Sequence, residues 1–233
     1  MSNRYRDLSK LGLLERTVSM DNSPSGHHYI VLSYLYEWME TIAVQHASGK
    51  LLDFGCGGQT YRNLFEGCVD QYIGADVVAA PGISLDIELK PNQAVDIEAG
   101  KIDTVLSNQV LEHVPDPNFY LSEVARVLKK NGTLVLTAPM QWRHHEVPFD
   151  YYRFTKYGVI DLLERNGFSV IRIDPCGGVF ALIGQILCDY FSSNNISFFK
   201  WGYRAMNRFF LWLDSKYPDS DSTINWMCIA KKL

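Results

Sequence analysis

The chain has 233 residues, of which 47% are hydrophobic, so it is long enough for one domain with a large buried core. Its net charge of −4, without a long basic run, argues against nucleic acid as a partner. Five cysteines without paired short spacing predict neither a disulfide framework nor a zinc site, and we expect a reduced, cytoplasmic protein.

Residues 1–48 are expected to form an N-terminal arm and a cap helix. The polar first ten residues are unlike a secretory signal, and no apolar run reaches the roughly twenty residues of a membrane helix. Ser23 and Pro24 suit the start of a helix, and apolar residues recur at helical spacing from Tyr29 to His46. The helix packs on a sheet in the simplest interpretation, and its start near His27 and His28 could also cover a ligand.

The stretch from Leu51 to Gly58 reads as an apolar strand, a glycine-rich turn and the start of a helix. Glycine tolerates positive φ and lets a ligand lie against the backbone, and the helix start presents N–H groups to the same place. Asp53 precedes the first glycine, and its carboxylate would repel a diphosphate by roughly several kcal/mol in a partly dry site. It therefore argues against NAD, FAD or ATP and favours S-adenosylmethionine (SAM), which carries an ammonium group and a cationic sulfur.

With an Asp-x-Gly-x-Gly pattern at residues 53–57, the chain resembles the class I SAM-dependent methyltransferases. The third glycine of some members is Gln59 here. The resemblance covers roughly residues 49–173 and a final strand. It implies that SAM is the cofactor, that the cap helix covers it, and that its methionine end is held by Asp53, Gly55, Cys56 and Gly57.

Further cofactor contacts are expected where the next strands end. Asp76 closes the second predicted strand, roughly twenty residues beyond the glycines, where such folds place a carboxylate on the ribose hydroxyls. Val77 follows it, and a solvated turn residue is the alternative role for Asp76. A third strand is predicted over residues 83–87, and the resemblance places its end, Asp86 and Ile87, beside the adenine, although Asp86 could equally be a plain loop acid.

The fourth strand, predicted over residues 102–106, runs into a segment very similar to that of the family. The resemblance implies that Asn108 and Gln109 in this segment line the cofactor cleft. Glu112 and His113 occur in the family whatever the substrate, so a structural or cleft role is preferred over a direct part in the chemistry.

Strands that alternate with helices predict an α/β fold with a parallel, doubly wound sheet. The resemblance completes it as a Rossmann-like sheet of seven strands, with the last strand antiparallel, in a SAM-binding domain over residues 49–233. The remaining elements are helices over 117–129 and 155–166, strands over 133–138, 169–173 and 223–231, and a helical insertion at 177–222.

The loop after the fifth strand is expected to receive the methyl acceptor, because ligands bind beyond the carboxyl ends of such strands. From His145 to Thr155 it resembles the His-x-x-Pro-x-Asp-Tyr-Tyr-Arg-Phe-Thr loop of a bacterial methyltransferase subgroup. His145 is the predicted base and Asp150 its orienting partner; in the competing interpretation, Asp150 pairs with Arg153 and shapes the loop. The candidate acceptor contacts are Trp142, His144, Tyr151, Tyr152 and Arg153.

We expect no metal site in this loop, because the neighbours His144, His145 and Glu146 rarely converge on one ion without further ligands. Within the insertion, residues 179–191 and 198–213 are helix candidates. The second carries an aromatic face beside a cationic one. It could form a lid over the cleft, a homodimer interface or a peripheral membrane contact. The aromatic face comprises Phe198, Trp201, Ala205, Phe209 and Trp212, and the cationic one Lys200, Arg204 and Arg208.

The predicted function is transfer of a methyl group from SAM to a small-molecule or sugar-containing (glycan-type) acceptor, on oxygen. The sugar comes from the resembled bacterial subgroup. One alternative is a non-catalytic SAM-binding regulatory protein. Others are a dinucleotide or nucleotide-sugar enzyme, against which Asp53 argues, and a membrane-surface interaction module.

Overall fold

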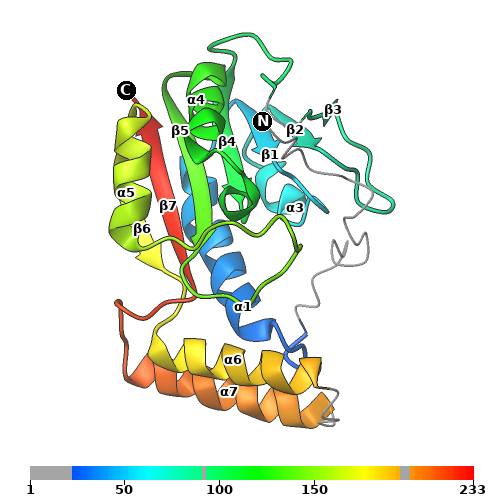
Figure 1. The fold of residues 1–233 in the computed structure, drawn as a ribbon, viewed down its shortest axis with the longest axis vertical. Coiled ribbons are helices and arrows are strands. Elements are labelled where there is room, and N and C mark those ends of the chain that lie inside the picture. Colours follow the sequence, from blue (N-terminus) through cyan, green and yellow to red (C-terminus); the bar gives the residue numbers. More distant parts are fainter. Residues whose placement is uncertain (1–22, 91–92, 195–199) are drawn as a thin grey trace.

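The protein is described by a computed structural model over residues 23–90, 93–194 and 200–233. A seven-stranded sheet in the order β3-β2-β1-β4-β5-β7-β6 forms its centre (Figure 1). Strands β1 to β5 are parallel, whereas β7 is antiparallel to both β5 and β6. The predicted Rossmann-like sheet with an antiparallel last strand is therefore confirmed. The strands are β1 (Lys50–Phe54), β2 (Gln71–Asp76), β3 (Ile87–Glu88), β4 (Ile102–Asn108), β5 (Leu128–Pro139), β6 (Phe168–Pro175) and β7 (Asn225–Lys232).

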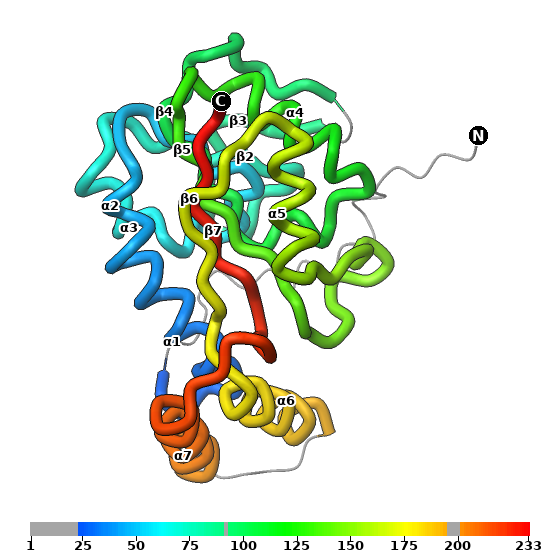
Figure 2. Tube along the Cα trace, turned by 90° about the vertical axis from the view of Figure 1, so that its left-hand side faces the viewer, coloured from blue at the N-terminus to red at the C-terminus, as the bar shows by residue number. Residues whose placement is uncertain are grey.

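Helices cover both faces of this sheet, with α1 to α3 on one side and α4 and α5 on the other (Figure 2). The helix predicted from Tyr29 to His46 is confirmed, and it runs through α1 (Tyr29–Trp38), a π-helical turn (Met39–Ala43) and α2 (Val44–His46). The other helices are α3 (Arg62–Phe65), the 3₁₀ turn η3 (Leu111–His113), α4 (Pro117–Val127), α5 (Lys156–Arg165), α6 (Val179–Ser193) and α7 (Lys200–Lys216).

Two hydrophobic clusters, one on each face, hold the helices to the sheet. Successive side chains of a strand point to opposite faces, so neighbours in the central strands enter different clusters. Val105 and Leu134 pack with α4 and α5, whereas Leu106 and Val135 pack with the cap helix. Burial on both faces explains why residues 133–138 of β5 are apolar apart from two threonines, whereas Lys129, Lys130 and Asn131 near its start are exposed.

The structure departs from the predicted boundaries most clearly at the third strand and at the helix predicted over 117–129. The third strand contains only residues 87–88. Just before it, the Asp86 N–H donates to the Gly74 carbonyl, and the Asp86 carboxylate accepts from the Gly74 N–H. The helix predicted over 117–129 ends at Val127, because Leu128 pairs with Ile102 and begins β5.

The helical insertion forms an antiparallel pair, α6 and α7, beyond one end of the sheet (Figures 1 and 2). Phe198, which was expected on its second helix, and the arm before residue 23 lie outside the described residues. Among residues 23–90, 93–194 and 200–233, no helix combines the length and the apolar character that crossing a bilayer requires.

Asp214 ties this helical pair to the cap helix. Its buried carboxylate, on α7, accepts hydrogen bonds from the backbone N–H groups of Gly178 (3.0 Å) and Ala181 (3.0 Å) at the start of α6. It also accepts from the Tyr34 hydroxyl of α1, at 2.6 Å. One side chain therefore fixes three helices, and the charge suits the positive end of α6.

We predict that Asp214→Ala lowers the free energy of unfolding by about 3–5 kcal/mol, because three buried donors lose a charged acceptor. Asp214→Asn keeps an acceptor oxygen and should cost less than half of this. The exposed neighbour Ser215→Ala serves as the control in urea denaturation. A loss below 1 kcal/mol for Asp214→Ala would show that the helices hold together without this carboxylate.

Candidate functional site

A cavity of about 710 Å³ opens at the carboxyl ends of β1, β2 and β4. Strand order reverses between β1 and β4, and ligands of open α/β sheets bind at such a switch point. The wall combines the start of the cap helix, the glycine turn, the ends of β2 and β4 and the loop after β5. A single space therefore spans both the predicted cofactor residues and the predicted acceptor loop.

The glycine turn is pinned to the end of β2. The Ala75 carbonyl accepts hydrogen bonds from the N–H groups of Gly55 (2.8 Å) and Cys56 (3.0 Å). Gly55 has φ +94°, and a Cβ there would lie 2.5 Å from a methyl carbon of Val110, so glycine is required twice over. A Cβ on Gly57 would meet nothing within 4 Å, which leaves that backbone open to a ligand.

Asp76 belongs to the same turn as well as to the cavity wall. One carboxylate oxygen accepts from the Gly57 N–H at 2.8 Å and the other from the Val77 N–H at 2.6 Å. Asp76 is only 4% exposed and lines the cavity together with Val77. The predicted ribose-binding carboxylate therefore also braces the turn that would hold the methionine end.

Asp53 supplies a second buried carboxylate to the wall. It is hydrogen-bonded by the Tyr72 hydroxyl. Burial raises the pKa of Asp53 to about 7; the Tyr72 hydrogen bond lowers it, and the nearby Asp76 carboxylate raises it. A cationic ligand would relieve the repulsion between the two carboxylates. The residues present therefore fit a ligand with an ammonium group and a cationic sulfur, as SAM has.

The predicted adenine contacts lie outside this wall. Asp86 and Ile87 do not belong to the cavity wall; the Asp86 carboxylate accepts the Gly74 N–H at 2.8 Å. Residues just beyond them, which the sequence had not singled out, line the cavity in their place: Leu89, Lys90 and Gln93.

Gln59, which replaces the third glycine, has φ +54°. Its side-chain amide donates to the Ser84 carbonyl at 3.2 Å, and its carbonyl oxygen accepts from Arg62 at 2.9 Å. Asn108 and Gln109 line the cavity as predicted, held by Thr137, whose hydroxyl donates to Asn108 Oδ1 at 2.8 Å and accepts the Gln109 N–H at 3.1 Å.

The loop after β5 is shaped by the pair Asp150–Arg153. The guanidinium donates to both carboxylate oxygens, at 2.6 and 2.8 Å, and the backbone N–H of His145 donates to one of them at 3.2 Å. Burial would raise the pKa of Asp150, but these hydrogen bonds lower it to about 2. The His145 Nδ1 lies 3.6 Å from Asp150 Oδ2, so the carboxylate faces both its ion-pair partner and the predicted base.

The predicted acceptor residues take different positions in this loop. Trp142, His144 and Tyr151 line the cavity, whereas Tyr152 donates its hydroxyl to the Pro115 carbonyl at 3.1 Å. Arg153 also donates to the Trp142 carbonyl at 3.2 Å, so it holds the loop together.

The sequence had not linked His145 to Glu112 and His113, which follow β4. The Nε2 atoms of the two histidines lie 3.0 Å apart, and the His113 Nδ1 lies 3.0 Å from the Phe149 carbonyl oxygen. Glu112 is fully buried beside them, and neither of its carboxylate oxygens has a hydrogen-bond partner. Burial raises the pKa of Glu112 to about 8, and its own backbone N–H and the charge of Arg153 offset part of the rise.

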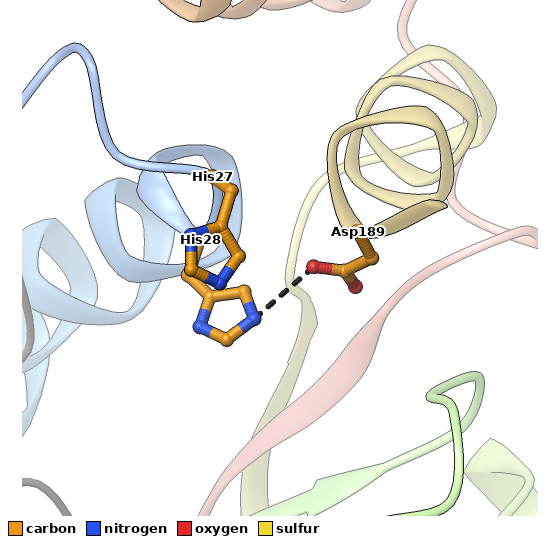
Figure 3. Close-up of side chains that lie close together, drawn as sticks. All are labelled: His27, His28 and Asp189. Atoms are coloured by element: carbon orange, nitrogen blue, oxygen red, sulfur yellow. Dashed lines mark ion pairs between the residues drawn. The ribbon is translucent and has the colours of Figure 1, made fainter. Parts of the chain in front are cut away.

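A second group of side chains joins the cap helix to the insertion (Figure 3). His28 Nε2 lies 3.1 Å from a carboxylate oxygen of Asp189 on α6, and the ring centroids of His27 and His28 lie 4.0 Å apart, with the rings tilted by 52°. The His28 ring also lies 5.5 Å from Trp142, and Arg143 donates to Ser193 of α6. The insertion therefore contacts both the cap helix and the acceptor loop at the mouth of the cavity.

The sequence matches the methyltransferase domain family over residues 27–171. A ubiquinone biosynthesis O-methyltransferase of Bartonella tribocorum is 28% identical over 106 residues, which cover 40% of this chain and 43% of that protein. The chain therefore matches less than half the length of this relative.

Solved structures share the fold. A SAM-dependent methyltransferase from Archaeoglobus fulgidus has a TM-score of 0.56 at 16% identity and covers 87% of this chain and 94% of its own. Phosphoethanolamine N-methyltransferase 2 from Haemonchus contortus, in complex with SAM, has a TM-score of 0.53 at 15% identity and covers 96% of this chain and 60% of its own.

We predict that SAM binding weakens as the pH falls through about 7, because a cation binds the ionised form of Asp53 and lowers its pKa. The affinity should fall by close to tenfold per pH unit below that value, with a proton released on binding near neutral pH. Calorimetry in two buffers of different ionisation enthalpy measures both effects. In Asp53→Asn this part of the pH dependence should vanish. Equal affinity of the wild type at about pH 5.5 and 8 would contradict the assignment.

Proposed function

The chain belongs to the methyltransferase domain family, whose cofactor is SAM, and we propose that it transfers the SAM methyl group to an oxygen of a small-molecule or sugar-containing acceptor. The observation that carries this proposal is the continuity of the cavity. Asp53 and Asp76 line one part of it, and His113 and His145 line another. Both reactants would meet there with little water between them.

In the cofactor part, Asp53 and the glycine turn would hold the methionine end, and Asp76 the ribose hydroxyls. Val77, Asn108 and Gln109 would lie along the nucleoside. SAM supplies a methyl group bound to a cationic sulfur. The acceptor oxygen would form a bond to that carbon as the carbon–sulfur bond breaks, which leaves S-adenosylhomocysteine.

In the acceptor part, the side chains that can accept a proton favour an oxygen atom as the methyl acceptor. A hydroxyl must lose its proton to become a good nucleophile, and His145 is the predicted base, with Asp150 as its partner. The relative from Bartonella tribocorum is named an O-methyltransferase, which supports oxygen, whereas the fold also serves the nitrogen acceptor of the Haemonchus contortus enzyme. The sugar-containing class rests on the resemblance of the loop from His145 to Thr155.

We also propose a cytoplasmic location, which five free thiols support.

The exposed aromatic side chains of α7 support a contact of residues 198–213 with a membrane surface or a second copy of the chain. Trp201, Phe209 and Trp212 are 72%, 52% and 53% exposed. Liposome flotation and light scattering of a variant with Trp201 and Trp212 replaced by Ser separate these partners.

Asp76→Ala should weaken SAM and S-adenosylhomocysteine alike by at least tenfold, because a charge-assisted contact of about 1.5–3 kcal/mol is lost. Asp70→Ala, an exposed carboxylate just before β2, is the matched control. Calorimetric titration gives both affinities. A change within twofold for Asp76→Ala would remove this residue from the cofactor site.

His145→Ala should lower S-adenosylhomocysteine formation by at least about 100-fold with an active hydroxyl acceptor and leave SAM affinity unchanged, since the ring acts on the acceptor alone. His46→Ala, a histidine at the end of α2 that does not line the cavity, is the control. The assay follows labelled SAM against a panel of phenols, sugars, nucleotide sugars and amines. If SAM binds but no acceptor raises product formation, the non-catalytic regulatory function replaces this proposal.

A further inference from the structure

Glu112 has a feature that the proposed methyl transfer does not explain. It lies on η3, directly after β4, with a fully buried carboxylate whose two oxygens lack hydrogen-bond partners. Burying an unpaired carboxylate costs several kcal/mol, and buried polar groups in native proteins are almost always satisfied. A proton or a cation must compensate for this burial.

The neighbouring imidazoles favour a cation. The Nδ1 of His113 lies 3.0 Å from the Phe149 carbonyl oxygen, and the Nδ1 of His145 lies 3.3 Å from the Arg143 carbonyl oxygen. A carbonyl only accepts, so each Nδ1 carries a hydrogen, and the Nε2 of a neutral ring is then the nitrogen with the lone pair. Both Nε2 atoms then present lone pairs to each other across 3.0 Å, an arrangement that repels unless a positive charge lies between them.

We propose that Glu112, His113 and His145 bind a divalent transition-metal ion such as Zn²⁺ beside the cofactor. The Glu112 Oε1 lies 3.9 Å from the His113 Nε2 and 4.0 Å from the His145 Nε2. A point equidistant from three atoms at these separations, with the Nε2 atoms 3.0 Å apart, lies about 2.1 Å from each, which matches Zn–N and Zn–O bond lengths.

The ligand types select the class of ion. Two imidazoles and one carboxylate suit Zn²⁺ and its neighbours, whereas Mg²⁺ and Ca²⁺ prefer oxygen ligands. The carbonyl contacts of both Nδ1 atoms are the outer-shell hydrogen bonds that orient metal-binding histidines. Three protein ligands leave at least one position open, as in catalytic zinc sites.

The role of this metal site rests on the proposed methyl transfer. The site also narrows the class of acceptor that the enzyme would use. His113 and His145 line the cavity, so the open position can face an acceptor. A bound hydroxyl would ionise more easily on the ion and release its proton to solvent. The resulting oxygen would then form the bond to the methyl carbon. With an ion present, His145 acts as a ligand and not as the base, and the acceptor is an ionisable hydroxyl compound.

The group His27, His28 and Asp189 also brings possible ligand atoms together. Its carboxylate differs from that of Glu112, because Asp189 accepts a hydrogen bond from the Gln185 amide at 3.1 Å and also lies 3.1 Å from His28 Nε2. It therefore serves as the internal control for the proposed site.

Titration of the tag-free, chelator-treated protein with Zn²⁺ and with Co²⁺ tests the proposal. We expect one equivalent to bind with micromolar or tighter Kd, with visible Co²⁺ absorption bands from the nitrogen and oxygen ligands. Glu112→Gln and His145→Gln should each weaken binding by at least about 100-fold, because loss of a ligand exceeds the loss of an outer-shell partner. His144→Ala and His28→Ala should match the wild type.

SAM titration of the same samples separates this proposal from the methyltransferase assignment. Retained SAM affinity in the metal-free protein and in Glu112→Gln shows that the fold is intact. If Glu112→Gln does not fold, His145→Gln, on the partly exposed loop, carries the test. Wild-type ion binding weaker than about 100 μM, binding that persists in His145→Gln, or binding lost only in His28→Ala would overturn the site, whether or not SAM binds.

Discussion

The attachment of the glycine turn to the end of β2 is the constraint on which the cofactor half of the molecule depends. Three successive backbone N–H groups, from Gly55 to Gly57, donate to the Ala75 carbonyl and the Asp76 carboxylate. The turn cannot move unless these bonds break, and β2 is paired along its length with β1. The same bonds place two carboxylates close together, and that accumulation of negative charge suits a cationic cofactor.

The two halves of the cavity are built on different principles. The cofactor half lies on strand ends within the sheet, whose residues are fixed by ladder hydrogen bonds. The acceptor half is a loop held by the Asp150–Arg153 pair and by contacts with the insertion, such as that of Arg143 with Ser193. A rigid scaffold that carries a variable loop is a common way for one fold to serve many acceptors.

Much of the fold and of the cofactor site could be predicted from the sequence, because both depend on local patterns. Alternating strands and helices, the Asp-x-Gly-x-Gly turn and an acid at the end of the second strand each read directly from neighbouring residues. The adenine contacts could not be predicted in this way. The pairing of the short edge strand β3 decides whether the Asp86 carboxylate faces a ligand or the Gly74 N–H.

The group of Glu112, His113 and His145 is the clearest case of a site that the sequence does not reveal. His145 follows Glu112 by more than thirty residues, and only the path of the loop after β5 brings its ring to the buried carboxylate. From its immediate neighbours, His144 and Glu146, the sequence predicted no metal site, and it assigned Asp150 as the partner of His145. The three side chains meet only in the folded structure, beside the unpaired Glu112 carboxylate, and residue spacing in the sequence does not show this.

A crystal structure of the complex with S-adenosylhomocysteine tests the central claim most directly. The claim predicts the ribose at Asp76, the amino group at the Asp53 carboxylate, and the sulfur turned toward the part of the cavity lined by His113 and His145. A sulfur that faces away from these histidines, or a ligand bound outside this cavity, would contradict the account.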